Sequence, residues 1–213
     1  MKEFAQKYHD LLTGEYKGIN LTRITTFEDF YQKQIVDSVL PLEVSKIFKK
    51  AIDDTKVIVD VGFGGGFPIL PLAYLYPDKK FVGFEARAKK AKVVQEIAEK
   101  LGLKNVKCYH HRIETVNIDI PVVITFKAVG TIENFIPLIK YREQTSVFFY
   151  KGPSFYELEE LEPTEKKWKV VEELFYDLEG TDGRTLIGLR NKTVPRGTLK
   201  KEIKNLVNLS QLI

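Results

Sequence analysis

The sequence of 213 residues predicts an α/β fold: a doubly wound, mostly parallel sheet with a terminal β-hairpin and an N-terminal helical extension. Continuous apolar runs, such as KVIVDV at 56–61, are typical of strands buried on both faces. Stretches with helical spacing, such as 88–101, alternate with these runs, as in a parallel sheet covered by helices. At the end of the chain, 167–178 and 185–191 have the pattern of two strands joined through EGTDG. Together these patterns predict a seven-stranded sheet.

The expected elements form one domain with three parts: a helical extension at 1–52, an α/β core at 53–191 and a basic tail at 192–213. In the extension, residues 2–13 place apolar side chains at helical spacing, and Thr26 has the position of an N-cap. The other expected elements are helices at 35–51 (interrupted near Pro41), 67–76 and 131–139, and strands at 80–85, 105–110, 121–126 and 145–150.

Composition and cysteine count exclude several classes of protein. With 44% hydrophobic and 29% charged residues, the chain can bury a core and is neither disordered nor fibrous. No apolar run is long enough to span a bilayer, and MKEFAQKYHD lacks the apolar centre of a signal peptide. Cys108 is the single cysteine, so neither an internal disulfide nor a cysteine-rich zinc site can form. We therefore expect a cytoplasmic protein that binds no membrane and no metal, and no sequence feature requires more than a monomer.

Charge is distributed unevenly along the chain, although the formal net charge is only +4. Residues 190–204 hold six basic side chains against one acidic side chain, and a second basic cluster lies at 87–92. Residues 157–173 are instead rich in glutamate. Basic clusters of this kind suit a polyanion such as a nucleic acid, although each can equally be a solvated face.

A glycine loop is the strongest motif. Gly62, Gly64 and Gly66 follow Asp60 where a strand ends and a helix begins. Glycines there let the backbone approach a ligand closely, at the edge where parallel sheets bind nucleotides. A P-loop is excluded because no Lys-Ser/Thr pair follows, and a dinucleotide fingerprint fits poorly because Phe67 occupies its third glycine position. An ordinary tight turn between strand and helix is the alternative.

The alternating glycines after an acid resemble the first motif of class I S-adenosylmethionine-dependent methyltransferases. Those enzymes have a Rossmann-like sheet of seven strands that ends in a hairpin. Their second landmark is an acid at the end of the second strand, which binds the ribose hydroxyls of the cofactor. Glu85 has that position, and a carboxylate accepts hydrogen bonds strongly. The resemblance implies S-adenosylmethionine as the cofactor, while Glu85 taken alone could also be a surface acid.

Residues that mark other methyl acceptors are missing from the sequence. No Asn/Asp-Pro-Pro-aromatic motif for adenine amines is present, and Cys108 lies inside an expected strand with no proline before it, so it is no clear nucleophile for pyrimidine C5. His110 and His111 follow a strand and could supply a base. A ring nitrogen such as guanine N7 carries a free lone pair and needs no base. An enzyme that works by positioning its reactants would fit this pattern.

Short segments along nearly the whole chain resemble the RsmG (GidB) family of small-subunit ribosomal RNA guanine-N7 methyltransferases. The core DVGFGGGFPILPLA resembles the family's DVGxGxGxPGxPLA. Two positions depart from the family pattern: Gln34 stands where histidine is usual, and Lys127 replaces an arginine, which keeps the charge but loses the planar fork. The matching segments are NLT at 20–22, IVDS at 35–38, the core at 60–73, RIE at 112–114, FKA at 126–128, KG at 151–152 and PRGT at 195–198.

The resemblance implies methyl transfer to N7 of a guanine in the 530 loop of 16S ribosomal RNA, either naked or in the small subunit. It implies that Lys127 is the catalytic residue, near both cofactor and RNA. Asp37 and Ser38 could serve the site or cap a helix that packs on the sheet. The implied cofactor-binding residues are Asp60, Gly62, Gly64, Gly66 and Phe67 in the loop, Glu85 at the ribose, Ile113 and Glu114 at the adenine, and Lys127. The candidates for binding RNA phosphates are Arg23, Lys127, Lys151, Arg184 and Arg196.

Two other functions stay open. The chain could be a class I methyltransferase that acts on a small molecule, or a non-catalytic RNA- or nucleotide-binding protein on the same fold. The flanking segments and the basic tail favour the ribosomal RNA enzyme.

Overall fold

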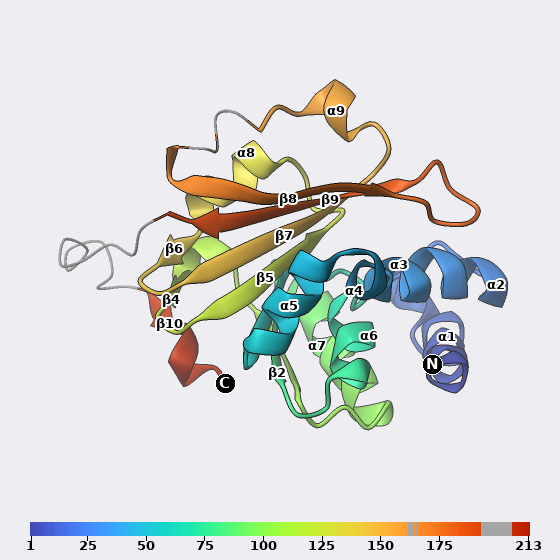
Figure 1. The fold of residues 1–213 in the computed structure, drawn as a ribbon. Helices are drawn as coiled ribbons and strands as arrows, with labels where there is room; N and C mark the ends of the chain where they lie inside the picture. Colours follow the sequence, from blue (N-terminus) through green and yellow to red (C-terminus); the bar gives the residue numbers. More distant parts are fainter. Residues whose placement is uncertain (162–163, 165, 193–205) are drawn as a thin grey trace.

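The computed structural model describes residues 1–161, 164, 166–192 and 206–213, and a seven-stranded sheet forms its centre (Figure 1). The strand order is β3-β2-β1-β5-β7-β9-β8. Neighbouring strands are parallel, except that β9 is antiparallel to both β7 and β8. The predicted doubly wound sheet and its terminal hairpin are confirmed. The strands are β1 Val57–Val61, β2 Lys80–Glu85, β3 Val106–His110, β5 Val122–Lys127, β7 Thr145–Lys151, β8 Trp168–Tyr176 and β9 Arg184–Asn191.

Strand β1 lies at the point where the direction of winding reverses. It is buried along its whole length, as its continuous apolar run predicts. Its last residue, Val61, pairs with Phe84 of β2 on one side and with Phe126 of β5 on the other. The carboxyl ends of these three strands therefore meet at one edge, and such an edge is where open α/β sheets bind their ligands.

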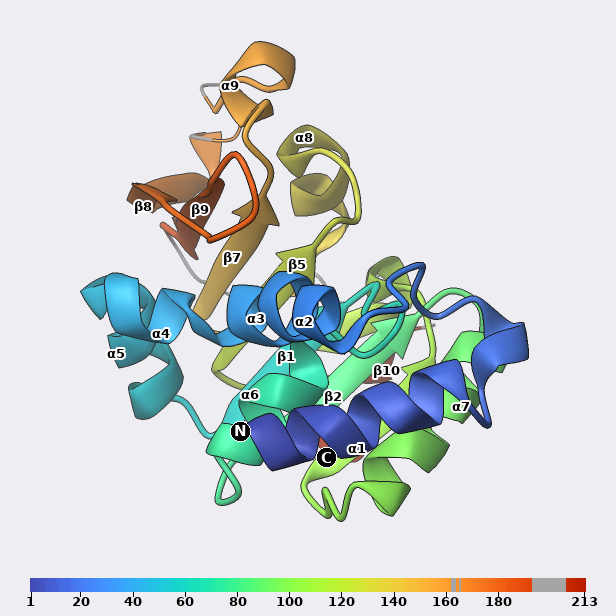
Figure 2. The same ribbon diagram turned by 90° about the vertical axis from the view of Figure 1, so that its right-hand side faces the viewer.

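Helices pack on both faces of the sheet (Figures 1 and 2). Figure 2 shows α1 lying across α6 and α7, and Phe4 of α1 stacks on Tyr74 of α6 with ring centroids 4.4 Å apart. The α-helices are α1 Lys2–Thr13, α2 Phe27–Phe30, α3 Asp37–Val39, α4 Pro41–Val44, α5 Lys46–Asp54, α6 Ile69–Leu75, α7 Ala88–Lys100, α8 Ile132–Phe135 and α9 Phe155–Leu158. One segment, η2 Tyr31–Val36, is a π-helix. The 3₁₀-helices are η1 Lys17–Ile19, η3 Ile113–Thr115, η4 Ile136–Leu138 and η6 Leu209–Gln211.

The helix expected over 35–51 is divided into three pieces. One boundary lies at Leu40, directly before Pro41, as expected; the backbone there stays helical at φ −53° and ψ −36°, and Pro41 opens α4, where its missing N–H costs nothing. The sharper break comes at Ser45, whose backbone is extended at φ −112° and ψ 110°. Its hydroxyl accepts a hydrogen bond from Phe48 N at 2.9 Å and caps α5. Preceding this region, η2 is wound as a π-helix, a form that is frequent at functional sites.

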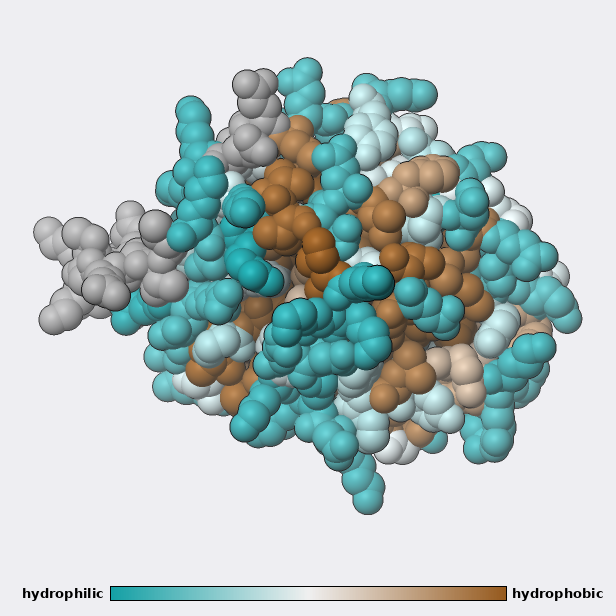
Figure 3. Space-filling view, viewed as in Figure 1, coloured by the Kyte–Doolittle hydropathy of each residue, from teal (hydrophilic) through white to brown (hydrophobic). Residues whose placement is uncertain are grey.

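Two apolar clusters fill the two faces of the sheet. The helices α1, α5, α6 and α7 contribute to one cluster. The other cluster takes residues from α8 and α9 and from the last residues of the chain. Polar side chains cover most of the face in Figure 3, with apolar atoms visible between them. No helix within the described ranges is long and apolar enough to cross a membrane.

The chain ends in a second, smaller sheet. Strand β10 Val207–Asn208 pairs in parallel with β4 Val116–Ile118, which also pairs with β6 Lys140–Tyr141. Leu209 is fully buried behind it. The last eight residues of the expected basic tail are therefore packed into the fold, while the greater part of that tail, 193–205, lies outside the described residues.

Candidate functional site

The glycine loop follows β1 at the edge where β1, β2 and β5 end. Gly62, Gly64 and Gly66 have φ values of +71°, +54° and +95°, a region that favours glycine. A Cβ on Gly62 would collide with a methyl group of Val129, so the turn after β5 presses directly against the loop. At Gly64 the nearest atom would be 3.8 Å away, which leaves this side of the loop open to a ligand.

The N-terminal helices hold the glycine loop from behind. Tyr8 of α1 is fully buried, and its hydroxyl donates a hydrogen bond to the Gly65 carbonyl. The ring of Phe67 stacks on Tyr8 at 5.1 Å and meets Phe30 edge-on at 5.7 Å. Because that packing occupies the Phe67 side chain, the expected contact with the cofactor can come only from its backbone. Tyr8 itself was not among the predicted site residues.

The two acids of the predicted motif have different environments. Glu85, 8% exposed at the end of β2, accepts hydrogen bonds from Gly64 N at 3.1 Å and Arg87 N at 2.9 Å, one on each oxygen. A carboxylate oxygen can accept a second hydrogen bond, so Glu85 can still bind two hydroxyls. Its position fits the ribose of a cofactor held over the open side of Gly64.

Asp60 lies beneath the loop and is only 1% exposed. Its oxygens accept hydrogen bonds from the Thr125 hydroxyl at 2.9 Å and from Ile69 N at 3.3 Å, which ties β1 to β5 and to the start of α6. Burial raises the pKa of this carboxyl to about 7, against the opposing effects of these hydrogen bonds. Asp60 therefore shapes the loop from below, and the expected direct contact with a cofactor is not supported by its position.

The segment after β3 forms the other wall of this edge. Ile113 and Glu114 lie in η3, with Ile113 buried and Glu114 half-buried. His110 is exposed, with Nε2 3.1 Å from the Ala86 carbonyl, and His111 packs edge-on to Phe84. Three strand spacings, roughly 14 Å, separate β3 from β5. The histidines therefore belong to the side of the edge opposite to β5 and its Lys127.

A buried charged cluster joins three distant parts of the chain. The Asp37 carboxylate lies 2.9 Å from Lys127 Nζ and 3.1 Å from Arg184 Nε, and Lys127 Nζ also donates to the Gln34 side chain at 3.3 Å. The side chains of Asp37, Lys127 and Arg184 are 3%, 11% and 20% exposed. We call these four residues the Asp37 cluster. Asp37 is therefore an ion-pair partner at the carboxyl end of β5 and does not act as a helix cap.

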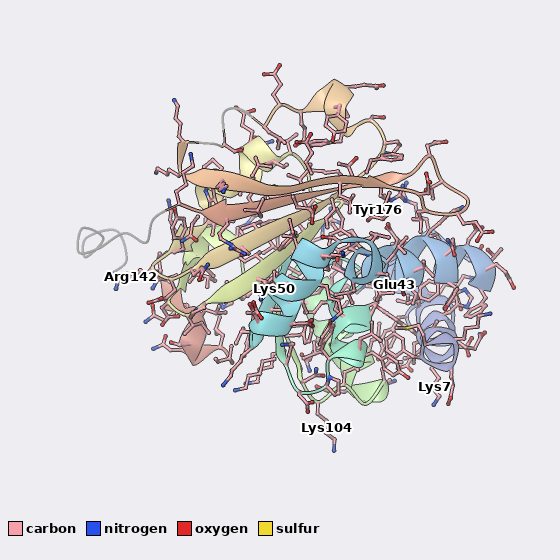
Figure 4. The ribbon with its side chains drawn as sticks, in the orientation of Figure 1. Lys7, Glu43, Lys50, Lys104, Arg142 and Tyr176 are labelled. Atoms are coloured by element: carbon pink, nitrogen blue, oxygen red, sulfur yellow. The ribbon has the colours of Figure 1, made fainter. Side chains whose placement is uncertain are left out.

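Tyr176 of β8, labelled in Figure 4, borders the Asp37 cluster and pairs in the hairpin with Arg184 of β9. Its hydroxyl is buried and has no hydrogen-bond partner among the described residues. Burial, and then the charge of Asp37, raises the pKa of Tyr176. The side chain is therefore a neutral hydroxyl next to the cluster.

The remaining RNA-binding candidates differ in exposure. Lys151 is 8% exposed, and its ammonium group donates to the Gly130 carbonyl and to Glu159, each at 2.6 Å. Glu159 thus offsets the charge of Lys151, and the expected contact of Lys151 with a phosphate stays a prediction. Arg23 is exposed, and Arg196 lies outside the described residues. Burial raises the pKa of the Cys108 thiol, which makes it a poor nucleophile.

A pocket of about 260 Å³ opens at the carboxyl ends of β5 and β7. The turn 128–131 forms one wall, Lys151 and Gly152 another, and Leu158 and Glu159 close it from α9. We call it the β5–β7 pocket. Its wall includes Val129, the residue that presses on Gly62, so the pocket adjoins the glycine loop. No three metal-binding side chains gather anywhere in the described parts of the chain.

The fold and this edge define a class I methyltransferase. A solved structure of magnesium protoporphyrin IX methyltransferase from Synechocystis, with S-adenosylmethionine bound, shares the fold with a TM-score of 0.56 at 11% identity. The match covers 89% of this chain and 97% of that one. The chain belongs to the rRNA small subunit methyltransferase G family, whose family model matches residues 1–186. The resemblance noted from the sequence is confirmed.

Bacterial relatives carry the name ribosomal RNA small subunit methyltransferase G. The relative from Petrotoga mobilis is 32% identical over 187 residues, which is 83% of this chain and 80% of that protein. The relative from Flavobacterium johnsoniae is 37% identical over 138 residues, 65% of this chain and 63% of its own. The match to the Clostridium perfringens relative covers 43% of that protein. In these last two comparisons the chain spans less than two thirds of the relative's length.

Proposed function

We propose that this protein transfers a methyl group from S-adenosylmethionine to N7 of a guanine in the 530 loop of 16S ribosomal RNA. The observation that carries the proposal is the contact between Val129 and Gly62, because it joins an open glycine loop to a pocket at the end of β5. Membership of the family supports ribosomal RNA as the substrate. The proposed partner is 16S RNA or the small subunit, met by a monomer in the cytoplasm.

The residues along the edge fit the proposed cofactor. Backbone atoms of Gly62, Gly64 and Phe67 would face its methionine part, Glu85 would accept from the ribose hydroxyls, and Ile113 with Glu114 would flank the adenine. When bound, S-adenosylmethionine supplies a methyl group on a positively charged sulfur. The open space at Gly64 and the unused acceptor capacity of Glu85 support this assignment.

The reaction needs no base from the protein. Guanine N7 attacks the methyl carbon with its own lone pair while the carbon–sulfur bond breaks, and the purine takes over the positive charge. The protein contributes alignment and a suitable electrostatic environment. A lysine without a counter-ion near the purine would disfavour the positive charge that develops on the purine ring. Asp37, 2.9 Å from Lys127 Nζ, offsets this effect.

The Asp37 cluster is the proposed contact with the target nucleotide. One carboxylate against Lys127 and Arg184 leaves one excess positive charge, and both cations are partly exposed. That charge suits one phosphate beside the target base. Arg23 and the basic segment that includes Arg196 are proposed to bind phosphates further along the RNA.

The test is methyl transfer from labelled S-adenosylmethionine to small-subunit particles and to naked 16S RNA, with the modified nucleoside identified by mass spectrometry. The expected product is N7-methylguanosine at one position. Cofactor binding without transfer to either RNA form would contradict the proposal and favour a small-molecule enzyme or a non-catalytic binder. A Gly62→Val variant, whose side chain would collide with Val129, serves as the control without transfer.

A further inference from the structure

The β5–β7 pocket carries polar groups that the proposed reaction does not use. Lys151 and Glu159 lie in its wall, next to the aromatic rings of Phe126 and Phe149. Building on the proposed function, we propose that this pocket receives the target base and that Lys151 and Glu159 recognise guanine by its O6 and N1–H. The pair would be the specificity-determining element of the enzyme.

The Lys151–Glu159 pair offers a donor and an acceptor side by side. An ammonium group has three N–H donors, and Lys151 spends one on the Gly130 carbonyl and one on Glu159 Oε1. Glu159 Oε2 accepts from Ile132 N at 2.7 Å, and both carboxylate oxygens keep further lone pairs. One donor and one acceptor thus remain for a ligand among the described contacts.

Guanine matches this arrangement and adenine does not. Guanine presents O6, an acceptor, beside N1–H, a donor. Adenine presents an amino group and an unprotonated N1 at the same places. Its amino donor would then face the Lys151 donor, and its N1 acceptor would face the Glu159 acceptor. A site built to pair a polar group rejects an analogue that lacks it by large factors, because its own buried groups are left without partners.

Burial makes this recognition strong. The side chains of Lys151 and Glu159 are 9% and 11% exposed, so their hydrogen bonds form with little competition from water. The ring centroids of Phe149 and Phe155 lie 5.3 and 5.8 Å from the Lys151 ammonium and add cation–π contacts to it. The pair is therefore fixed in place before a base arrives.

The surroundings of the pocket suit a base and oppose a phosphate. Glu133, Glu157 and Glu160 are exposed and line the adjoining hollow with Glu159. Tyr156 and Leu158 are 56% and 76% exposed at this rim, where an aromatic ring can stack on a neighbouring base. The phosphates are left to Lys127 and Arg184 of the Asp37 cluster. A base held by O6 and N1 keeps N7 free to face the turn at Val129.

The experiment compares three RNAs that differ only at the target position, using the full chain and the RNA form that it methylates. Guanosine and inosine both carry O6, N1–H and N7, so we expect kcat/KM values within about threefold of each other, because only the amino group differs. 2-Aminopurine keeps N7 but lacks O6 and N1–H, and we expect a loss of at least ~1,000-fold. Transfer to 2-aminopurine within tenfold of guanosine would overturn the pocket assignment.

Two variants sharpen this experiment. Glu159→Gln keeps the size of the side chain but removes its charge, and we expect a ~100-fold loss of kcat/KM on guanosine with unchanged cofactor affinity. Glu43→Gln, exposed on α4 and outside the pocket (Figure 4 labels Glu43), is the control and should behave as the parent protein. Equal activity of both variants would contradict the proposal. If the Glu159→Gln variant does not fold, the comparison of the three RNAs with the unchanged protein still tests the proposal.

The outcome also separates this inference from the proposed function. Absence of N7-methylguanosine from unmodified RNA, with the cofactor bound, contradicts the proposed function and the inference with it. Transfer to N7 of guanosine and 2-aminopurine alike contradicts the pocket assignment alone.

Discussion

Replacing Asp37 with asparagine tests the Asp37 cluster most directly. The Asp37→Asn substitution would keep the shape of the side chain but leave Lys127 and Arg184 without a counter-charge, at 11% and 20% exposure. Removing one partner of a buried ion pair costs about 3–5 kcal/mol, and the retained amide oxygen favours the lower end. For a chain of this size, a loss of ~3 kcal/mol lowers the melting temperature by ~6–12 °C.

The control for this substitution is Asp54→Asn. Asp54 forms the same kind of ion pair with Lys50, 2.8 Å apart, but its side chain is 62% exposed (Figure 4 labels Lys50). An exposed pair contributes about 0–1 kcal/mol, so a change of less than ~4 °C is expected. Thermal unfolding followed by circular dichroism measures both variants. Equal melting temperatures for the two variants would refute the reasoning that Asp37 holds two buried cations together.

Three further predictions concern the glycine loop and β5. Tyr8→Phe removes one hydrogen bond to the loop while the ring stays packed. We expect a loss of ~1–2 kcal/mol in unfolding free energy, measured by thermal melting, and weaker cofactor binding, measured by calorimetry. Tyr74→Phe, at a residue that is 41% exposed, should change neither quantity. The pKa of Asp60, about 7 in the folded protein, is above its unfolded value. Between about pH 4 and 7 the folded protein therefore keeps a proton on Asp60 that the unfolded chain releases. The free energy of unfolding, compared with that of Asp60→Asn, should fall by up to ~4 kcal/mol as the pH rises through this range. A difference in unfolding free energy between the two proteins that stays constant with pH would contradict this. Glu85→Ala should weaken cofactor binding about 10–100-fold, whereas Lys127→Ala should leave cofactor binding within about twofold and abolish methyl transfer; the reverse pattern would show the two roles to be exchanged.

Much of the fold follows from local sequence pattern. A continuous apolar strand such as β1 is buried only when it has a neighbouring strand on each side and a covering layer on each face of the sheet. The loop after it takes positive φ values, which glycine favours. The hairpin at β8 and β9 follows from its alternation and its turn residues. These features depend on neighbours in the sequence, and so the sequence alone predicts them.

The side-chain partners at the site could not be predicted in this way. Arg184 pairs with Asp37 across 147 positions, and Tyr8 reaches the loop across 57. A lysine after a strand has the same sequence pattern whether it faces solvent or is enclosed, which is why the sequence placed Lys151 at a phosphate. Its partner Glu159 lies eight positions later in an acidic stretch that offers several candidates.

The long separation between Asp37 and Arg184 also has a consequence for biosynthesis. At about 5–20 residues per second, the ribosome needs roughly 7–30 s to extend the chain from one residue to the other. During that interval the nascent protein can form β1 and the glycine loop while the carboxylate of Asp37 still lacks its second cation. A truncated product that stops before β9 would hold a loop for the cofactor and an incomplete contact for RNA. Only the finished chain would then assemble both halves of the proposed active site.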